Sequence, residues 1–407
     1  MSFRVALTGL EAASSDLNVT SNNIANVNTT GFKESRAEFS DVFATTSGDI
    51  ADTSTGNGVR LQRVAQQFTQ GDIQFTENNL DMAVSGEGFF TLSGSDGQVY
   101  SRAGNFSVDR DGFVQNNLGE RLQVFPPAGE DTFNTGQLED LQLVTGENAP
   151  QATETIRAEL NLPADAEQPI NVGAFAPDDP LSFNSSRSVT IRDSLGNRQD
   201  ATIFFVKTAN DNEWNASLFV NDDQVGAQET LQFDPDGALA TPADGLIDFG
   251  TLNRQNGAED LDLEVDFQGT TQFGGGFGVT ELSQDGSAVG RLVGFNVDDA
   301  GIASARFSNG QTQSLGKVAL ANFDNPQGLQ ELGDTRWGET FAAGEALLGE
   351  AGTSGFGNVQ AGALESANVD LTEQLVSQIT AQRNFQANAQ VISTADEVTQ
   401  TIINITR

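Results

Sequence analysis

The longest regular pattern of apolar positions lies at the C-terminal end of the chain. Between residues 371 and 405, apolar side chains return at steps of three and four that are broken only around Gln382, and the stretch contains no glycine or proline. This spacing is typical of the stripe on a long amphipathic α-helix. Asn368 or Asp370 can cap the first turn, and Glu373 follows within it. The residues of this stripe that we expect to pack in a helical layer are Leu371, Leu375, Ile379, Phe385, Ile392, Ile402 and Ile405.

A second apolar series lies at the N-terminal end and predicts another helix, which ends near Val27. Its members recur every seven residues, with one more at an intermediate position, and they are Phe3, Leu7, Leu10, Leu17 and Ile24. The other faces of both predicted helices carry Ser, Thr, Asn, Gln and Ala and few charges. Because solvated helix faces are normally charged, two interpretations stay open. One is a helical hairpin docked on its own domain, and the other is a helical layer that is completed only in a polymer.

Between the two helices the pattern changes to an alternation with period two, which predicts short strands separated by turns. One group of strands lies between residues 89 and 124 and resumes between 292 and 323, and another lies between 188 and 267. Residues 33 to 70 show little periodicity, so we expect a polar connector there, with a loop at 45 to 58.

This order of elements predicts an α+β fold that is mainly β by content and is built from nested, discontinuous domains. We expect the long terminal helices to pack together as a coiled-coil-like layer, and a fragment from about residue 71 to 355 to fold without them. The predicted parts are a terminal helical domain (1–32 and 363–407), a connector (33–70 and 350–362), an inner β domain (71–147 and 286–349) and an inserted outer β domain (148–285).

Charge is concentrated in the middle of the chain. The formal charge of −37 comes from 57 acidic and 20 basic residues, of which only three are lysines. Residues 148 to 285 hold 24 acidic and 6 basic residues, a net charge of −18, whereas residues 1 to 36 hold three of each. Such a surface repels nucleic acid and anionic membranes, so we expect neither as a partner. A source organism in saline water is a hypothesis that follows from the same excess.

Several residue patterns that suggest chemistry have simpler explanations. The chain has no cysteine and no histidine, which excludes disulfides and thiolate metal sites and removes the commonest general base. Segments starting at Asp109, Asp234 and Asp298 resemble the opening of a calcium loop but lack an oxygen ligand at the fifth position, so we expect hairpin turns. Acid pairs such as Asp178 and Asp179 are common in so acidic a chain and indicate a solvated surface rather than glycoside hydrolysis. We therefore predict a protein that is not an enzyme and needs no metal or cofactor. An acidic secreted hydrolase or lectin, the alternative, would need a converging polar pocket.

No apolar run approaches the ~20 residues that span a bilayer, and the N-terminus lacks the pattern of a cleavable secretory signal. If the protein leaves the cytoplasm, we expect another export route.

Three motifs, in their order along the chain, resemble those of bacterial flagellar rod and hook proteins. They comprise residues 22 to 33 (NNIANVNTTGFK), the β-region segments 88–90 and 100–112, and the C-terminal segments 369–375 and 381–388. The motif residues that we single out are Asn22, Asn23, Ala25, Asn26, Thr29, Gly31, Phe32, Gln382, Arg383 and Asn388.

The chain's length and the segments 201–208 and 313–329 make it similar to the hook proteins of this family. The resemblance implies a structural subunit of the flagellar hook, a flexible curved tube that transmits torque from rod to filament as a universal joint; a distal-rod-like subunit is the alternative. It also implies self-polymerisation and contacts with the rod, the hook cap and the hook–filament junction proteins. Export would use the flagellar type III apparatus without a cleaved signal peptide, to an extracellular place in the hook and basal body. The terminal helices would line the central channel, and the acidic domain would lie outermost.

Overall fold

The structure is a computed structural model that describes residues 2–42, 56–95, 97–129, 132–143, 146–253 and 257–405. The chain forms two compact units. The first consists of Met1–Thr145, Gly294–Ala305 and Gln313–Arg407, and the second of Gly146–Val293 and Arg306–Thr312. The four-part division predicted from the sequence stays a prediction.

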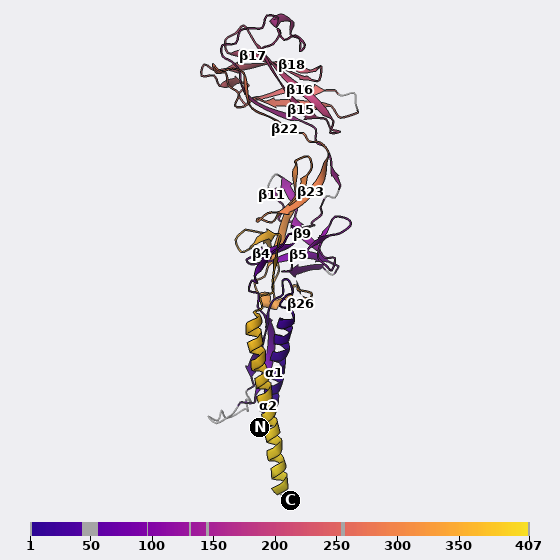
Figure 1. Ribbon diagram of the computed structural model, residues 1–407, viewed down its shortest axis with the longest axis vertical. Helices are drawn as coiled ribbons and strands as arrows, with labels where there is room; N and C mark the ends of the chain where they lie inside the picture. The colour runs from indigo at the N-terminus through magenta and orange to yellow at the C-terminus, as the bar shows by residue number, and fades with distance from the viewer. Residues whose placement is uncertain are drawn as a thin grey trace. The chain divides into compact units, whose positions relative to one another are not determined.

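Two long helices occupy the two ends of the chain, α1 (Ser2–Ala25) and α2 (Leu371–Ile405). They lie side by side and run in opposite directions (Figure 1). The α2 helix begins after Asp370, whose Oδ1 accepts the backbone N–H groups of Thr372 (2.7 Å) and Glu373 (3.1 Å). Asp370 is therefore the N-cap, one of the two predicted candidates. The predicted class, two terminal helices packed together with β-rich domains, is confirmed. Within the described residues, neither helix has an apolar stretch of the length needed to cross a membrane.

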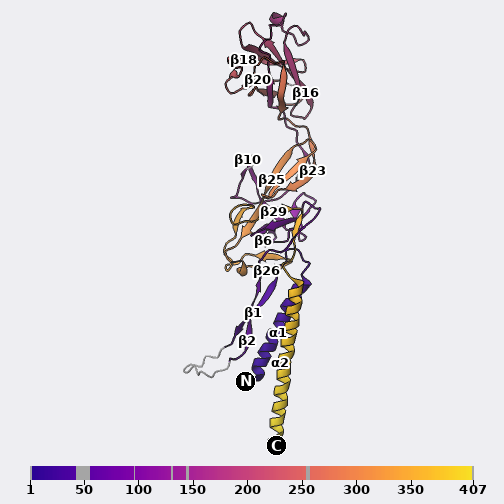
Figure 2. The ribbon, with the colours of Figure 1, turned by 60° about the vertical axis from the view of Figure 1, so that its left-hand side comes forward.

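A hairpin that the sequence did not predict lies beside α1 (Figure 2). Its strands are β1 (Ser35–Asp41) and β2 (Val59–Gln66), within the stretch expected to be a connector. The register shifts after Glu38, so the alternation of apolar and polar residues is interrupted. Most of the predicted loop (45–58), namely residues 45 to 55, lies outside the described residues.

In the first unit, strands from before and after the long insertion pair with each other. The main sheet has the order β25–β9–β5–β6–β27–β26, and β24 and β23 continue it beyond β25. Two small sheets add the pairs β4–β29 and β3–β30. The segment 326–328 forms a short 3₁₀ turn. The strands are β3 (Ile73–Phe75), β4 (Met82–Ser85), β5 (Phe89–Gly94), β6 (Gly97–Ser101), β7 (Ser107–Val108), β8 (Val114–Gln115), β9 (Arg121–Phe125), β10 (Pro127–Gly129), β11 (Thr132–Phe133), β12 (Glu139–Asp140), β23 (Gly290–Val297), β24 (Ile302–Phe307), β25 (Thr312–Asn322), β26 (Gln330–Gly333), β27 (Arg336–Gly338), β28 (Leu347–Glu350), β29 (Asn358–Ala361) and β30 (Ala363–Glu365).

The core of this unit also contains side chains from both sides of the long insertion, because it lies between these paired strands. Leu320 of β25 is paired with Phe90 of β5, and both side chains are fully buried. Trp337 of β27 is paired with Tyr100 of β6 in a second, aromatic cluster. Neither half can bury its apolar face alone, so the β part of the unit requires both.

The second unit contains two sheets that share one buried core. Their orders are β20–β21–β14–β22 and β15–β16–β17–β18–β19. Along β16, Ala201, Ile203 and Phe205 are fully buried at every second position, as expected for a strand with one face on the core. Residues 172 to 174 form a short 3₁₀ turn. The strands are β13 (Glu147–Asn148), β14 (Thr155–Asn161), β15 (Ser185–Arg192), β16 (Arg198–Lys207), β17 (Glu213–Val220), β18 (Asp223–Phe233), β19 (Leu239–Thr241), β20 (Leu246–Leu252), β21 (Leu261–Asp266) and β22 (Gly278–Gln284).

The three segments that resemble calcium loops are hairpin turns, as predicted. They connect β7 to β8, β18 to β19 and β23 to β24. In each, the carboxylate of Asp109, Asp234 or Asp298 accepts the backbone N–H groups two and four residues on, at 2.8 to 3.0 Å. The glycine three residues on has a positive φ in all three. The carboxylates thus stabilise the turns themselves.

The strand pairing predicts where a fragment without helices should end. Residues 71 to 367 keep the pairs β4–β29 and β3–β30, whereas residues 71 to 355 lose both pairs and also Glu365, which binds Arg102. We expect the longer fragment to be a monomer that melts cooperatively, and the shorter one to melt at a lower temperature. Scanning calorimetry of both measures this. Equal melting temperatures would show that β29 and β30 stabilise nothing, and an unfolded longer fragment would show that the strands need the helices.

Candidate functional site

Small and polar side chains form the contact between α1 and α2. A Cβ atom on Gly9 would lie 2.7 Å from Oδ1 of Asn388, so the two helices approach closely there. Farther along, Nδ2 of Asn23 donates a hydrogen bond of 3.1 Å to Oε1 of Gln374. Both pairs obey one antiparallel register, which the helices keep over about four turns. The buried residues of the two helices are Ala6, Ala13, Thr20, Asn23, Gln374 and Ala381.

The large apolar side chains of the two predicted series lie mostly outside this contact. Phe3 and Leu7 of α1 are 47% and 41% exposed. The half-buried members are Leu10, Leu17, Ile24, Phe385 and Ile392, and the exposed members on α2 are Leu371, Leu375, Ile379 and Ile402. The side chain of Ile405 lies outside the described part of the chain. Packing of these residues in a polymer stays a prediction, and the single chain leaves their stripes open to another partner.

A groove of about 970 Å³ lies between the start of α1 and the C-terminal half of α2. Phe3 lines it from one side, and Val391 and Val398 line it from the other. All three side chains are exposed. An apolar groove of this size on a helical pair is a typical binding surface for another apolar side chain or helix.

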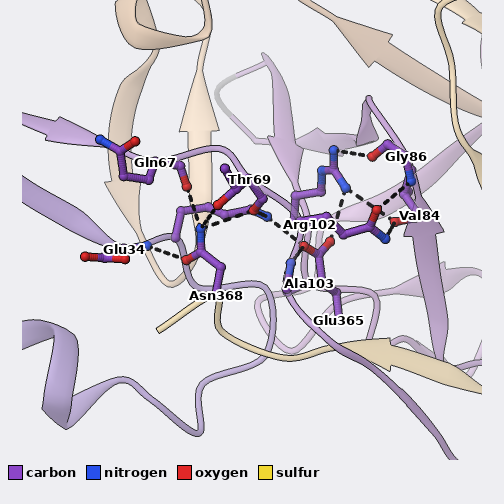
Figure 3. Close-up of polar contacts among 12 residues, drawn as sticks. Glu34, Gln67, Thr69, Val84, Gly86, Arg102, Ala103, Glu365 and Asn368 are labelled. Atoms are coloured by element: carbon purple, nitrogen blue, oxygen red, sulfur yellow. Dashed lines mark hydrogen bonds and ion pairs between the residues drawn. The ribbon is translucent and has the colours of Figure 1, made fainter. Parts of the chain in front are cut away.

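A buried cluster of charges ties the helical ends to the strands (Figure 3). Glu365, at the end of β30, receives Nζ of Lys33 at 2.6 Å on Oε1 and Nη1 of Arg102 at 3.1 Å on Oε2. The side chains are 1% (Lys33), 0% (Glu365) and 5% (Arg102) exposed. The backbone N–H of Gly71 also donates to Oε1, at 2.9 Å. We call Lys33, Arg102 and Glu365 the Glu365 cluster.

The electrostatics of the Glu365 cluster are unbalanced, because two cations share one carboxylate. Burial lowers the pKa of Lys33, and the carboxylate of Glu365 opposes this effect. Burial likewise lowers the pKa of Arg102, again against Glu365. Backbone carbonyls take up other N–H donors: Lys33 donates to Thr69 (2.7 Å), and Arg102 donates to Gly86 (2.8 Å). Removing the carboxylate of Glu365 would leave two buried cations with no ion-pair partner, and only the exposed Glu87 would act on Arg102 from a greater distance.

A second polar network extends from this cluster to the contact between the helices. Oδ1 of Asn368 accepts the backbone N–H of Glu34 at 2.7 Å, and its Nδ2 donates to the carbonyl of Thr69 at 3.1 Å (Figure 3). Oε1 of Glu34 in turn accepts Nε2 of Gln374 at 2.9 Å, and Gln374 binds Asn23. Burial raises the pKa of Glu34, and the hydrogen bond from Gln374 opposes the rise. Asn368, the other predicted cap, thus connects segments instead of capping α2.

The residues singled out from the family motifs lie in different places. Asn22, Asn26 and Thr29 come together at the end of α1, where Asn26 donates to the carbonyl of Asn22 (3.0 Å) and Thr29 donates to Oδ1 of Asn26 (3.1 Å). Asn23 and Asn388 lie in the contact between the helices. Phe32 is half-buried, and Ala25, Gln382 and Arg383 are exposed.

Gly31 has a position that only glycine fits. Its φ is +68°, its N–H donates to the carbonyl of Glu365 at 2.8 Å, and an added Cβ would lie 2.5 Å from the backbone nitrogen of Ala103. Sequence reasoning singled out Gly31 but missed Glu365, Arg102, Gln374 and Gly9 as contact residues. The sequence offers no clear signal for these residues, since Glu365 is one of 57 acidic residues and its partner Lys33 stands beside other charges, Glu34 and Arg36.

The approach of Gly9 to Asn388 predicts a coupled effect of two substitutions. Alanine at an exposed helix position stabilises by about 1 kcal/mol relative to glycine. In Gly9→Ala, the new methyl group must displace the Asn388 side chain. We therefore expect a stabilisation smaller than this value, or a destabilisation. In the background of Asn388→Ala the full gain should appear. Thermal unfolding followed by helical circular dichroism gives both values, and additive effects would contradict the close contact.

Known protein families match consecutive parts of the chain. Models described as flagella basal body rod protein and flagellar hook protein FlgE/F/G D1 domain match residues 3–33 and 83–174. Models described as flagellar basal body protein FlaE D2 domain and flagellar basal body rod FlgEFG protein C-terminal match residues 161–287 and 360–405.

Full-length relatives carry the same description. The flagellar hook protein FlgE of Escherichia coli is 38% identical over 412 residues, with 100% of both chains covered. The flagellar hook protein FlgE of Salmonella typhimurium is 36% identical over 413 residues, again with 100% of both covered. Among solved structures, the Helicobacter pylori flagellar hook protein FlgE2 is similar, with a TM-score of 0.54 over 72% of this chain and 100% of that one. Its identity of 14% supports the fold alone.

Proposed function

Because this chain belongs to the family of flagellar hook proteins, we propose that its paired terminal helices are the surface through which it polymerises into the hook. The chain is a structural subunit of the bacterial flagellar hook and not an enzyme. The distal-rod-like alternative is not retained, since the relatives that match over the full length are hook proteins.

The observation that carries this proposal is the exposure of large apolar side chains on a helical pair. Leu371, Leu375 and Ile379 follow each other at steps of four on α2, and all are between 44% and 49% exposed. Burying one such side chain fully contributes about 1.5 to 3 kcal/mol. A single chain forgoes this contribution, and neighbouring copies can recover it by packing their helices against the open stripes and the groove at Phe3.

The same helices bear few charges, so copies can approach one another at their ends without strong repulsion. Acidic residues are concentrated between 148 and 285 instead. We propose that the helices form the wall of a central channel and that the acidic unit lies outermost. Bending would then require the outer parts to slide past each other while the helices hold their register.

The remaining partners and the route to the assembly site are proposals from the family. Contacts with the rod, the hook cap and the hook–filament junction proteins are expected at the ends of the tube. We further propose export through the flagellar type III apparatus without a cleaved signal peptide, and an extracellular position of the finished hook. The direct test is an electron micrograph of the purified protein polymerised in salt, in which we expect curved tubes; amorphous aggregate alone would contradict the function.

Phe385 provides a test of the helical surface, since it is the largest side chain of the predicted α2 stripe. We expect Phe385→Ala to raise the critical concentration for assembly, because truncating a buried Phe costs about 3 to 5 kcal/mol in each subunit. Melting of the β-rich units should be nearly unchanged. Pelleting across a concentration series and calorimetry measure the two effects.

Phe205→Ala is the matched control, because Phe205 is fully buried in the core of the second unit. This substitution should lower the melting temperature and leave the critical concentration nearly unchanged in protein that is still folded. If Phe385→Ala assembles as the original chain does, Phe385 faces solvent in the polymer.

Charge repulsion predicts that assembly depends on salt. At 0.1 M salt the Debye length is about 10 Å, so the field of a chain with charge −37 extends to its neighbours in dilute buffer. We expect little polymer at about 10 mM salt and more towards about 0.5 M, as suits an organism of saline water. A variant lacking residues 148 to 285 should assemble with a weaker dependence. If the amount of polymer does not change with salt concentration in either chain, the acidic segment has no part in controlling assembly and serves solubility alone.

A further inference from the structure

We propose that the Glu365 cluster is a positioning device that fixes the direction in which the helical pair leaves the β strands, and that it thereby determines the helical lattice of the polymer. The proposal rests on the function given above, because it concerns the geometry of a tube made from copies of this chain. It assigns a role to Lys33, Arg102 and Glu365 that is distinct from adding stability.

The first argument is where the three residues come from. Lys33 follows the last residue of α1 by eight residues, Glu365 precedes the first residue of α2 by six, and Arg102 directly follows strand β6. One carboxylate therefore connects the start of both helical connections to the strands of the first unit. Its two oxygens bind different partners, Lys33 and Gly71 on Oε1 and Arg102 on Oε2. Charge-assisted hydrogen bonds from several directions allow one orientation of the carboxylate.

The second argument is that the cluster is a poor source of stability. Two cations and one anion are removed from water, and the desolvation of buried charges can exceed their mutual attraction. Nε of Arg102 is moreover buried without a hydrogen-bond partner. Apolar side chains of similar volume would often serve stability equally well. What apolar side chains lack is direction, and this is what the cluster supplies.

Two backbone contacts limit movement at the same place. The N–H of Gly31 donates to the carbonyl of Glu365, and Gly31 lies against Ala103 without room for a side chain. Asn368 binds both the N–H of Glu34 and the carbonyl of Thr69. The connections from α1 and into α2 are thus held on both sides of the Glu365 cluster, and little slack remains between the helices and the strands.

The length of α2 makes this orientation important. A helix of 35 residues is about 50 Å long, so a rotation of about 5° at its start displaces its far end by about 4 to 5 Å. Close-packed side chains tolerate only shifts that are much smaller than this displacement. A small change at the Glu365 cluster would therefore alter which residues of neighbouring helices meet, and with them the rise and twist of the polymer.

The test replaces the cluster by apolar side chains of similar size, in the triple variant Lys33→Met, Arg102→Met and Glu365→Leu. The matched control is Lys317→Met with Glu350→Leu, which removes an ion pair of 2.8 Å between β25 and β28 of one sheet. Electron micrographs of the polymers give rise and twist. We expect the control to keep the original lattice and the triple variant to show a shifted or heterogeneous one, with similar melting of the strands. An unchanged lattice in the triple variant would overturn the proposal.

A second measurement decides the case in which the triple variant forms no polymer. The chain has no cysteine, so spin labels can be attached to cysteines introduced at two exposed positions, Glu11 on α1 and Asp111 in the β7–β8 turn. Pulsed electron resonance of the soluble full-length chain should give a narrow distance distribution with the cluster and a broader or shifted one in the triple variant. An unchanged narrow distribution would overturn the proposal. If the original chain forms no tubes, the proposed function fails, and the distances still test the cluster.

Discussion

Both ends of the chain are held against the strands by one buried carboxylate. Glu365 is fully buried and binds Lys33 and Arg102. The three residues come from three distant parts of the sequence. Because an unpaired buried charge is very costly, Lys33 and Arg102 each depend on Glu365, and Glu365 depends on having at least one of the two cations. The first unit can therefore form completely only when its N-terminal, central and C-terminal segments are all in place. This requirement is the same one that the strand pairing of β25 with β5 and β9 imposes on the sheet.

Charge is distributed unevenly along the chain, and we propose that association and solubility depend on different parts of it. The helices carry few ionisable residues, while the segment from 148 to 285 holds 24 of the 57 acidic residues. All three lysines, Lys33, Lys207 and Lys317, are buried, and each donates hydrogen bonds within the chain. The ammonium groups thus serve to hold segments together rather than to neutralise the surface. The surface of the protein therefore carries a strong negative electrostatic field, which salt can screen.

Much of the fold follows from periodicity in the sequence, and the exceptions have physical reasons. The helices and most strands have clear periods of 3.6 and 2, and the Asp-Gly turns use well-known backbone chemistry. The β1–β2 hairpin was not predicted, because a register shift after Glu38 interrupts its alternation of apolar and polar residues. Glu365 could not be identified as a buried residue, since it is one of 57 acids and burial of a charge depends on partners distant in sequence. Seven-residue spacing revealed that α1 has an apolar stripe, but not which neighbour covers it.

The contact between the helices explains how a single subunit can have a fixed helical pair and still expose large apolar side chains. If Leu371, Leu375 or Phe3 packed between α1 and α2, the pair would be more stable alone and would have less apolar surface to share. Instead Gly9, Ala13, Asn23, Gln374 and Ala381 bring the helices close with little apolar area, and hydrogen bonds fix their register. The large side chains stay exposed on the outside of the pair, where we propose that burial by another copy stabilises the polymer. We propose that the acidic unit opposes premature association, so that the balance between monomer and tube depends on two separable quantities, the apolar area at the ends and the charge in the middle of the chain.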